Sequence, residues 1–299
     1  MPKAVDPNAP SGLVVVDKPQ GITSHDVVSR MRRLAGTRKV GHAGTLDPMA
    51  TGVLLVGVNK ATRLLTYLVG QDKVYEATIR LGETTSTEDA EGEILQRRYV
   101  AAVTRQALDA AVEALTGDIQ QVPSAVSAIK VDGKRSYQRV RDGEEVELPA
   151  RPVTIKRFEI LDVRRPEGGR TMDVDVVVEC TSGTYIRALA RDLGEALSVG
   201  GHLTALRRTS VGGFGLDKAA TLEELAERFE MLPLPEAARG LFPARELTAE
   251  EVNELGFGRR IEANATAELT AGFAPDGRLI ALMNNVKDKA KPELVFETR

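Results

Sequence analysis

The amino-acid sequence predicts an α+β fold with a mixed or antiparallel central sheet. Apolar and alternating segments typical of strands are more numerous than a doubly wound βαβ fold needs. Short helical stripes are interspersed among them without a regular βαβ order. The chain has 299 residues, of which 42% are hydrophobic and 28% charged. This is ordinary for a globular protein, and it is enough for one large and one small domain with a real core.

The N-terminal part of the chain alternates strands and helices. Leu13 to Val16 is a short apolar strand, and Ser24 to Leu34 has a helical pattern that ends at Gly36. A second apolar strand is predicted over Val53 to Val58, followed by a helix over Lys60 to Leu68.

The middle of the chain has the clearest strand patterns. Apolar and polar residues alternate from Val74 to Leu81, which places Tyr75 on the apolar face. Residues 108–115 carry a helical apolar stripe. A second alternating strand, Met172 to Cys180, makes the cysteine a core residue. Thr184 is predicted to cap the helix that follows this strand.

The chain changes character from about residue 241, where a small β-rich module is predicted. A helix is expected over residues 247–255, and a Pro-Asp-Gly turn occupies residues 275–277. Three short strands are expected over residues 267–270, 279–283 and 294–296.

Several protein classes are disfavoured by composition. No apolar run approaches the roughly 18 residues of a membrane span. Residues 1–11 lack the apolar stretch of a signal peptide, so a short disordered lead is expected there. The single cysteine excludes an internal disulfide, and three widely spaced histidines argue against a structural metal site. We therefore expect a cytoplasmic protein that binds no metal.

The charges are segregated along the sequence although the net charge is only −3. Basic clusters lie at residues 30–39, 130–141 and 207–208, whereas acidic residues gather at 83–93 and 223–254. Such segregation suits a polyanion bound on one face, and it equally suits solvated helix faces. Charge alone leaves both interpretations open.

One carboxylate, that of Asp47, lies on a loop of turn residues, Gly41 to Gly52. Pro48 fixes its own φ and favours an extended Asp47, while glycine lets other backbone approach closely. Asp47 is therefore a candidate catalytic residue. The alternative is a surface turn with a capping aspartate.

Four further residues are candidates, each with a structural alternative. Tyr75 is either a half-buried core residue or a platform on which a flipped base could stack. Arg187 lies beside the apolar stripe of its helix, where it could be solvated or could hold a carboxylate ionised. His42 by itself suggests a satisfied loop histidine, and spacing favours Lys18 as a solubilising strand end over a phosphate contact. The acidic segment 82–89 lacks calcium-loop spacing and is expected to be a solvated loop.

Five segments carry the most specific motifs. They are VVDKPQGITS from Val15, GHAGTLDP from Gly41, KVYEA from Lys73, VPSAVSAIK from Val122 and GTYIRALARDLG from Gly183. Together and in this order they resemble the motifs of the TruB family of tRNA pseudouridine synthases. The likeness runs from about residue 12 to about residue 214. No nucleotide-binding, zinc-protease or serine-hydrolase motif competes with it.

The resemblance implies a pseudouridine synthase fold with a PUA-like C-terminal module. It implies a catalytic domain at 12–240, with a mobile RNA-contacting insertion at about 124–150, and an RNA-binding module at 241–299. The implied reaction converts uridine 55 in the T-loop of tRNA to pseudouridine, and an additional tRNA-folding chaperone role could coexist with it. The T-arm of tRNA is the implied partner. No cofactor, metal, membrane or protein partner is required.

The resemblance also assigns residue roles. Asp47 matches the catalytic aspartate, Arg187 the arginine that pairs with it, and Tyr75 the tyrosine that stacks on the flipped base and assists removal of the C5 proton. Whether Asp47 attacks C1′ or removes the 2′-proton stays open, as do another RNA target and an RNA chaperone without dominant catalysis. Substrate-binding positions are matched by His42, Lys18, Tyr185 and Leu206.

Overall fold

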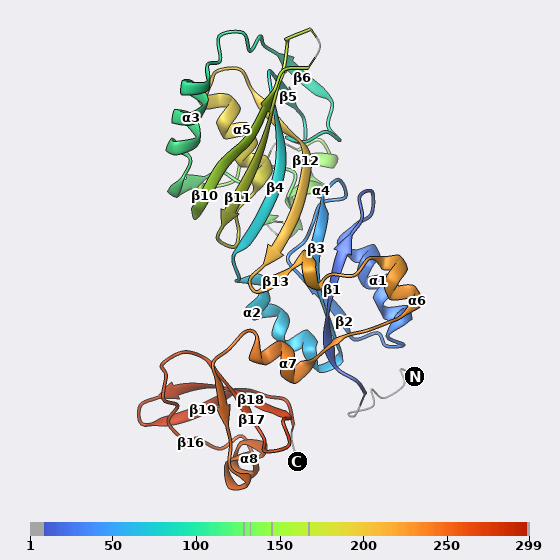
Figure 1. The fold of residues 1–299 in the computed structure, drawn as a ribbon, viewed down its shortest axis with the longest axis vertical. Coiled ribbons are helices and arrows are strands. Elements are labelled where there is room, and N and C mark those ends of the chain that lie inside the picture. The colour runs from blue at the N-terminus through green and yellow to red at the C-terminus, as the bar shows by residue number, and fades with distance from the viewer. Residues whose placement is uncertain (1–8, 128, 132, 145, 167, 298–299) are drawn as a thin grey trace.

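The protein is described here from a computed structural model, which covers residues 9–127, 129–131, 133–144, 146–166 and 168–297. Most of the predicted disordered lead, residues 1–8, lies outside this description. A ten-stranded sheet with helices packed on it forms the larger body, and a five-stranded sheet forms a smaller one (Figure 1). The predicted α+β fold with a small C-terminal β-rich module is confirmed.

The central sheet is mixed. Within the described part of this sheet, β3 and β12 pair in parallel and every other neighbouring pair of its strands is antiparallel. Two strands lie off its main path, β2 (Val40–Ala43) beside β3 and β13 (Phe214–Gly215) beside β12. The main path runs β14 (Leu232–Pro233), β1 (Gly12–Lys18), β3 (Thr51–Val58), β12 (Gly201–Val211), β4 (Lys73–Leu81), β11 (Met172–Cys180), β10 (Arg151–Arg164) and β7 (Gly117–Gln121).

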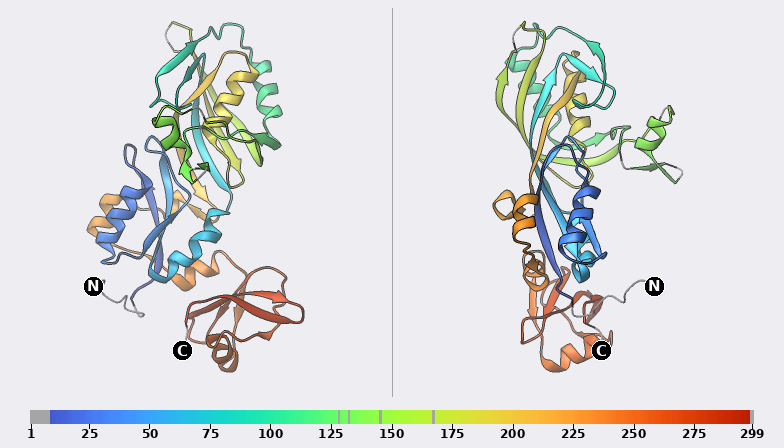
Figure 2. Two further views of the ribbon diagram at one scale, coloured as in Figure 1. Left: turned by 180° about the vertical axis from the view of Figure 1, so that it is seen from behind. Right: turned by 90° about the vertical axis from the view of Figure 1, so that its right-hand side faces the viewer.

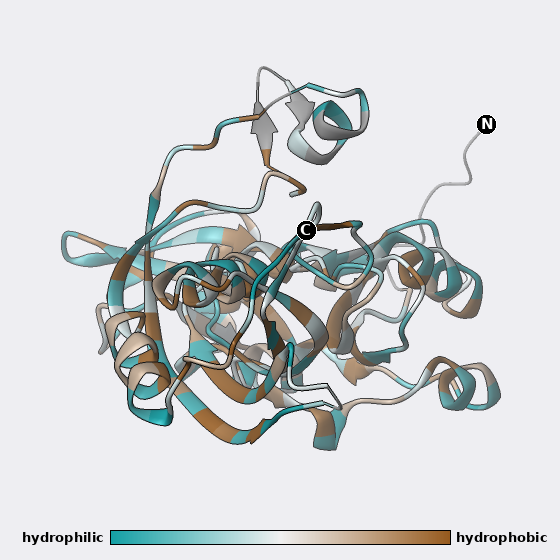
Figure 3. Cartoon of the chain, turned by 90° about the horizontal axis from the view of Figure 1, so that it is seen from above, coloured by the Kyte–Doolittle hydropathy of each residue, from teal (hydrophilic) through white to brown (hydrophobic). Residues whose placement is uncertain are grey.

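The alternation predicted for the two central strands is confirmed. Tyr75 and the other odd-numbered residues of β4 are buried, while the even-numbered ones are half-buried or exposed. Cys180 at the end of β11 has no exposed surface. Coloured by hydropathy, the strands of this sheet carry brown hydrophobic segments alternating with teal hydrophilic ones (Figure 3).

Helices flank the sheet at both ends (Figures 1 and 2). The helix α1 (Ser24–Leu34) has the predicted bounds and begins with a reciprocal capping pair, Thr23 and Asp26. The predicted helix over residues 60–68 instead begins as a 3₁₀ turn, η1 (Asn59–Leu64), and only then becomes α2 (Leu65–Val69); neither start has a side-chain cap. The remaining helices of this body are α3 (Arg105–Ala114), α5 (Ile186–Ala196), η2 (Leu216–Lys218), α6 (Leu222–Glu227) and α7 (Leu234–Arg239).

The predicted cap of α5 is wrong. The helix begins at Ile186 with Tyr185 as its N-cap residue, and that residue makes no side-chain capping hydrogen bond. The hydroxyl of Thr184 donates backwards to the carbonyl of Thr181 at 2.9 Å. Thr184 therefore closes the turn that precedes the helix.

Two small hairpins extend from the larger body. One consists of β5 (Glu83–Thr85) and β6 (Ile94–Arg97), and the other of β8 (Lys130–Val131) and β9 (Lys134–Arg135). The second leads into α4 (Ser136–Arg141), which projects away from the central sheet (Figure 2, right).

The second sheet has the strand order β15 (Ala244–Glu246), β17 (Thr270–Phe273), β18 (Leu279–Val286), β19 (Lys289–Val295) and β16 (Ile261–Glu262), with α8 (Ala249–Gly256) against it. The predicted turn is confirmed, because Gly277 adopts a φ of 84° and its amide donates to Ala274. The strand predicted over residues 267–270 begins only at Thr270 and runs to Phe273. Inside it, Gly272 lies so close to Leu247 and Met283 that a Cβ there would clash.

Side chains of η1, α2 and α7 join the second sheet to the first. The Arg63 guanidinium lies 5.1 Å from the ring centre of Phe296, and Arg239 lies 3.8 Å from that of Phe273. The two bodies therefore pack directly against each other. No helix among the described residues combines the length and apolarity that crossing a membrane would need.

Candidate active site

A cavity of about 270 Å³ lies where the loop after β2 meets the start of α5. Five of the seven predicted site residues line it, whereas Lys18 and His42 are placed nearby, outside its lining. The five are Asp47, Tyr75, Tyr185, Arg187 and Leu206.

Residues 44–50, here called the Asp47 loop, are held by hydrogen bonds from Ser24 and from Gly21. The Ser24 hydroxyl at the start of α1 accepts from the amide of Leu46 at 2.9 Å and donates to its carbonyl at 3.0 Å. The amide of Gly21 donates to the carbonyl of Pro48 at 2.8 Å. The backbone is thus fixed on both sides of Asp47, whose side chain remains 38% exposed. A surface turn would not be tied in this way.

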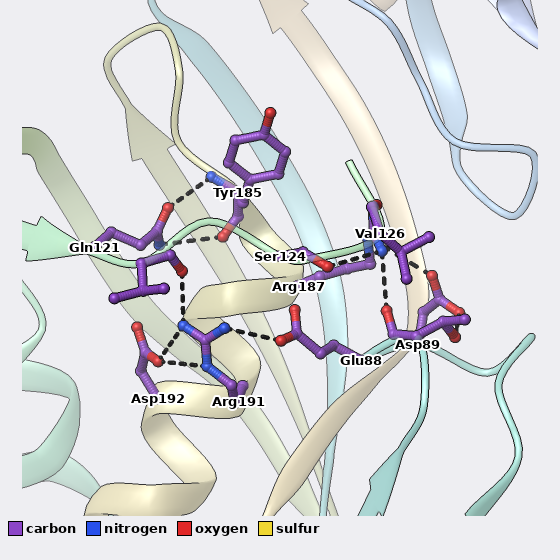
Figure 4. Close-up of polar contacts among 11 residues, drawn as sticks. Glu88, Asp89, Gln121, Ser124, Val126, Tyr185, Arg187, Arg191 and Asp192 are labelled. Carbon is purple, nitrogen blue, oxygen red and sulfur yellow. Dashed lines mark hydrogen bonds and ion pairs between the residues drawn. The ribbon is translucent and has the colours of Figure 1, made fainter. Parts of the chain in front are cut away.

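Arg187 is buried, which corrects the interpretation as a solvated helix residue. It is 4% exposed, and its Nε lies 3.0 Å from Oδ2 of Asp47. Its two terminal nitrogens are engaged elsewhere, with Nη1 donating to the carbonyl of Thr87 and the hydroxyl of Ser124, and Nη2 to the carbonyl of Val126 (Figure 4). The guanidinium is therefore locked by neighbouring loops while one edge meets the aspartate.

A second carboxylate, Asp89, was missed by the sequence analysis. The acidic segment that contains it was expected to be solvated, yet Asp89 is 3% exposed and its Oδ2 lies 3.6 Å from Nε of Arg187. Its Oδ1 accepts a hydrogen bond from the Thr87 hydroxyl. A buried carboxylate is stabilised by a cation close to it in space, and here that cation is Arg187, which lies far from Asp89 in the sequence. Nothing in the local sequence signals this pairing.

Tyr75 forms the floor of the cavity and is 7% exposed. Burial raises the pKa of its hydroxyl, whereas the positive charge of Arg208 and a hydrogen bond from it act in the opposite direction. The two residues lie directly opposite each other on β4 and β12. Tyr75 is therefore a buried phenol with a cation beside it.

The third basic cluster of the sequence, Arg207 and Arg208, is not a basic surface patch. Arg208 is 1% exposed and donates to the carbonyls of Gly44 and Val53. Arg207 points the other way and pairs with Asp17, with 2.6 Å between Nη2 and Oδ2. A polyanion footprint cannot include Arg208.

Lys18 is completely buried, so its interpretation as a solubilising strand end is wrong. Its Nζ donates to the carbonyls of Pro19 at 2.9 Å and Ile22 at 2.8 Å, and lies 3.4 Å from that of Pro48. Burial lowers the pKa of this amine to about 8, against the opposing charge of Asp47. Lys18 ties the end of β1 to the Asp47 loop from beneath.

His42 belongs to β2 and not to a loop. Its ring meets that of His25 edge to face, with 5.5 Å between centres. Its Nδ1 is buried and has no hydrogen-bond partner among the described residues. Burial lowers the pKa of the imidazole to about 4, so the ring is neutral at pH 7.

Tyr185, the N-cap residue of α5, and Leu206 on β12 are the other two predicted residues that line the cavity. The side-chain amide of Gln121 clamps the backbone of Tyr185, accepting from its amide at 2.8 Å and donating to its carbonyl at 3.1 Å (Figure 4). Leu206 is 9% exposed and supplies an apolar wall. Nowhere in the described part of the chain do three or more His, Cys, Asp or Glu side chains gather in a way that could hold a metal ion.

Comparison with known families decides which family this site belongs to. The model of the "TruB family pseudouridylate synthase (N terminal domain)" matches residues 32–186, and two models of TruB C-terminal regions match residues 187–233 and 242–297. The chain belongs to the TruB family. It is therefore an isomerase of the pseudouridine synthase class, and the resemblance seen in the sequence is confirmed.

Two relatives show how closely this TruB family member matches proteins of known name. A "tRNA pseudouridine synthase B" of Paenarthrobacter aurescens is 66% identical over 295 residues, covering 96% of this chain and 95% of the relative. Another of Thermobifida fusca is 57% identical over 287 residues, covering 95% and 98%. Among solved structures, a Cbf5–Nop10–Gar1 complex contains a chain with 27% identity and a TM-score of 0.73, covering 96% of this chain and 85% of that one.

Proposed function

We propose that this TruB family member converts uridine 55 in the T-loop of tRNA to pseudouridine, with Asp47 as the catalytic residue. One observation carries the proposal. Asp47 is the carboxylate of the cavity that remains partly exposed, at 38%, while its partner Arg187 is buried 3.0 Å away. The names of the two relatives, tRNA pseudouridine synthase B, support tRNA as the substrate.

The reaction needs no outside atoms. The bond between N1 and C1′ breaks, the uracil turns in the cavity, and C5 bonds to C1′ while the C5 proton leaves and N1 gains one. A carboxylate can either attack C1′ or remove the 2′-proton, and both routes need it ionised. The fixed guanidinium of Arg187 places a positive charge 3.0 Å from one oxygen of this carboxylate. No cofactor is required, because substrate and product are isomers.

The cavity walls suit a single extruded base. A uridine held in a folded T-loop hides its glycosidic bond, so it must be turned out at a cost of a few kcal/mol. The rings of Tyr75 and Tyr185 offer stacking surfaces, and Leu206 offers an apolar wall. We propose that the neutral ring of His42 enters the T-loop and fills the space left by the flipped nucleotide. Lys18 supports the Asp47 loop from inside.

The RNA footprint is proposed to lie over α1 and the insertion. Arg30, Arg32 and Arg33 on α1 are exposed, as are Arg38 and Lys39 that follow. Such residues neutralise phosphates and release counterions. We keep residues 12–240 as the catalytic domain and 241–299 as an RNA-binding module.

The insertion at about 124–150, from which α4 projects (Figure 2), is proposed to close on the T-arm. Limited trypsin digestion should cut residues 130–141 in the free enzyme and spare them when a T-arm stem-loop is bound. Equal cleavage in both samples would count against closure.

Asp47→Asn is the decisive variant, because it keeps the shape of the side chain and removes its charge. Pseudouridine is mapped on a T-arm stem-loop after incubation with the parent or the variant. We expect modification at uridine 55 by the parent, none by the variant, and equal RNA binding by both. Undiminished turnover by Asp47→Asn would refute the proposal.

Two alternatives are tested with the same proteins. Modification of a ribosomal RNA fragment but not of the stem-loop would indicate another RNA target. A tRNA-folding chaperone role predicts that Asp47→Asn still accelerates refolding of a misfolded tRNA.

A further inference from the structure

A single buried side chain joins the two ends of the Asp47 loop. Arg208 on β12 donates from Nη2 to the carbonyl of Gly44, where the loop begins, at 2.9 Å. It donates from Nε to the carbonyl of Val53, just after the loop has ended, at 2.8 Å. The planar guanidinium presents these donors in a fixed arrangement. The separation of the loop ends is therefore set by one rigid group.

Two glycines pack against Arg208 in backbone conformations that other residues rarely adopt. A Cβ on Gly52 would lie 2.2 Å from the carbonyl oxygen of Arg208, and Gly52 has a φ of 99°. A Cβ on Gly44 would lie 3.4 Å from Nη1 of Arg208, at a φ of 76°. Glycine is the residue that tolerates both the conformation and the close approach. Strand β12 and the Asp47 loop are thus built against this arginine.

Arg208 carries an unusual energetic cost. It is 1% exposed, yet it forms no ion pair with a carboxylate of the described residues, and it donates to neutral groups, the carbonyls of Gly44 and Val53 and the hydroxyl of Tyr75. A buried cation without a counter-charge is unfavourable compared with an apolar residue of similar volume. The neighbouring Arg207 shows the ordinary arrangement, since it faces away and pairs with Asp17. The cost of burying Arg208 points to a role in the adjacent site.

We propose that Arg208 is a positioning residue of the isomerisation, which fixes the Asp47 loop relative to Tyr75. The two residues lie opposite each other across β4 and β12, and Arg208 also lines the cavity. One guanidinium thereby spans the loop that carries the carboxylate and the strand that carries the phenol. This inference rests on the proposed catalytic role of Asp47.

The test compares Arg208→Lys and Arg208→Gln with the control Arg207→Met, in the full chain. Lysine keeps the charge and glutamine keeps an amide donor. Neither side chain has the planar guanidinium that donates from Nε to Val53 and from Nη2 to Gly44. Arg207 is the neighbouring arginine on the same strand, but it pairs with Asp17 and faces away from the cavity. Three quantities are measured: the single-turnover rate at saturating T-arm RNA, the affinity for that RNA, and the folded fraction by circular dichroism.

We expect the rate of both Arg208 variants, normalised to folded protein, to fall roughly 10²-fold, as for a small misplacement of a catalytic group. RNA affinity should be unchanged, because Arg208 is buried, and Arg207→Met should keep the parent rate. A parent rate in Arg208→Lys would overturn the inference, and so would failure of both variants to fold, which would indicate a purely structural role. Asp47→Asn is run alongside: a parent rate there rejects the proposed function itself, whatever the Arg208 variants do.

Discussion

Replacement of Arg187 by methionine should reveal how much of the fold depends on the site. Methionine has a comparable length and fills the space without charge or donors. The substitution removes the cation beside Asp89, which is only 3% exposed, and that beside Asp47, which is 38% exposed by side chain. It also removes the donors that hold the carbonyls of Thr87 and Val126.

The main loss comes from Asp89. Breaking a buried ion pair by removal of one partner costs about 3–5 kcal/mol, because an uncompensated charge remains inside. The half-exposed Asp47 contributes little in comparison, since exposed pairs are worth about 0–1 kcal/mol. At roughly 2–4 °C per kcal/mol for a chain of this size, the melting temperature should fall by on the order of 10 °C.

The assay is urea and thermal unfolding at pH 7.5 of the parent, Arg187→Met, Asp89→Asn, the double variant and Asp47→Asn. The double variant should be more stable than the sum of the single losses predicts, because it buries no lone carboxylate. Asp47→Asn is the matched control and should unfold close to the parent. Equal destabilisation by Asp47→Asn and Arg187→Met, or additive losses in the double variant, would refute the assignment of Asp89 as the structural partner of Arg187.

Three further predictions concern other parts of the molecule. Thr23→Ala removes one half of the capping pair of α1 and should lower the free energy of unfolding by about 1 kcal/mol in urea; no loss would contradict the capping assignment. The pKa of Lys18 is about 8 in the folded protein and 10.5 in the unfolded chain, so the contribution of the neutral amine to stability is complete above pH 10.5 and is lost as the pH falls through 8. The unfolding free energy of the parent relative to Lys18→Met should therefore rise by up to about 3 kcal/mol from pH 8 to pH 10.5. A difference that does not change with pH would reject the buried amine. The pair Arg30→Glu and Arg33→Glu should weaken T-arm binding and reduce the slope of log affinity against log salt by about 2, whereas an unchanged slope would move the RNA footprint elsewhere.

Local patterns predicted those parts of the fold that depend on local physics. The alternation in β4 and β11 follows directly from the pleat, and it correctly buried Tyr75 and Cys180. The bounds of helix α1 could also be predicted from the sequence, because its capping residues lie next to its apolar stripe. In these segments one face of the element is buried along its whole length, so the spacing of apolar residues in the sequence equals the spacing of buried residues in the structure.

Two long strands of the same sheet were not predicted, and their irregularities explain why. Register shifts occur in β12 between Leu203 and Ala205 and between Arg208 and Ser210, and β10 has two similar shifts. Each shift moves the following side chains to the opposite face. The apolar residues of β12 therefore show no twofold period, although Leu203, Leu206 and Val211 are buried. Which side chains of a bulged strand are buried therefore depends on its pairing with the neighbouring strands, which the local sequence does not show.

Buried charges were the principal error at the site. Local spacing favoured solvent exposure for Lys18, for Arg187 and for the segment of Asp89, because charged residues are rarely buried without partners. All three are buried, and the partner of each lies far along the chain or in the backbone of a loop. The resemblance to the TruB family identified Lys18 and Arg187 as site residues, but only the structure revealed Asp89 and Arg208.

The partners of the buried cations explain how an acidic protein can present a positive site. Lys18, Lys73 and Arg208 are each less than 8% exposed, and each donates hydrogen bonds to backbone carbonyls. Carbonyl dipoles satisfy the donors but do not cancel the charges, and none of the three forms an ion pair within the described residues. The positive potential therefore remains beside the cavity although the whole chain carries −3. Because these charges lie beneath the surface, they act on the side chains that line the cavity and are not neutralised by surface counter-charges.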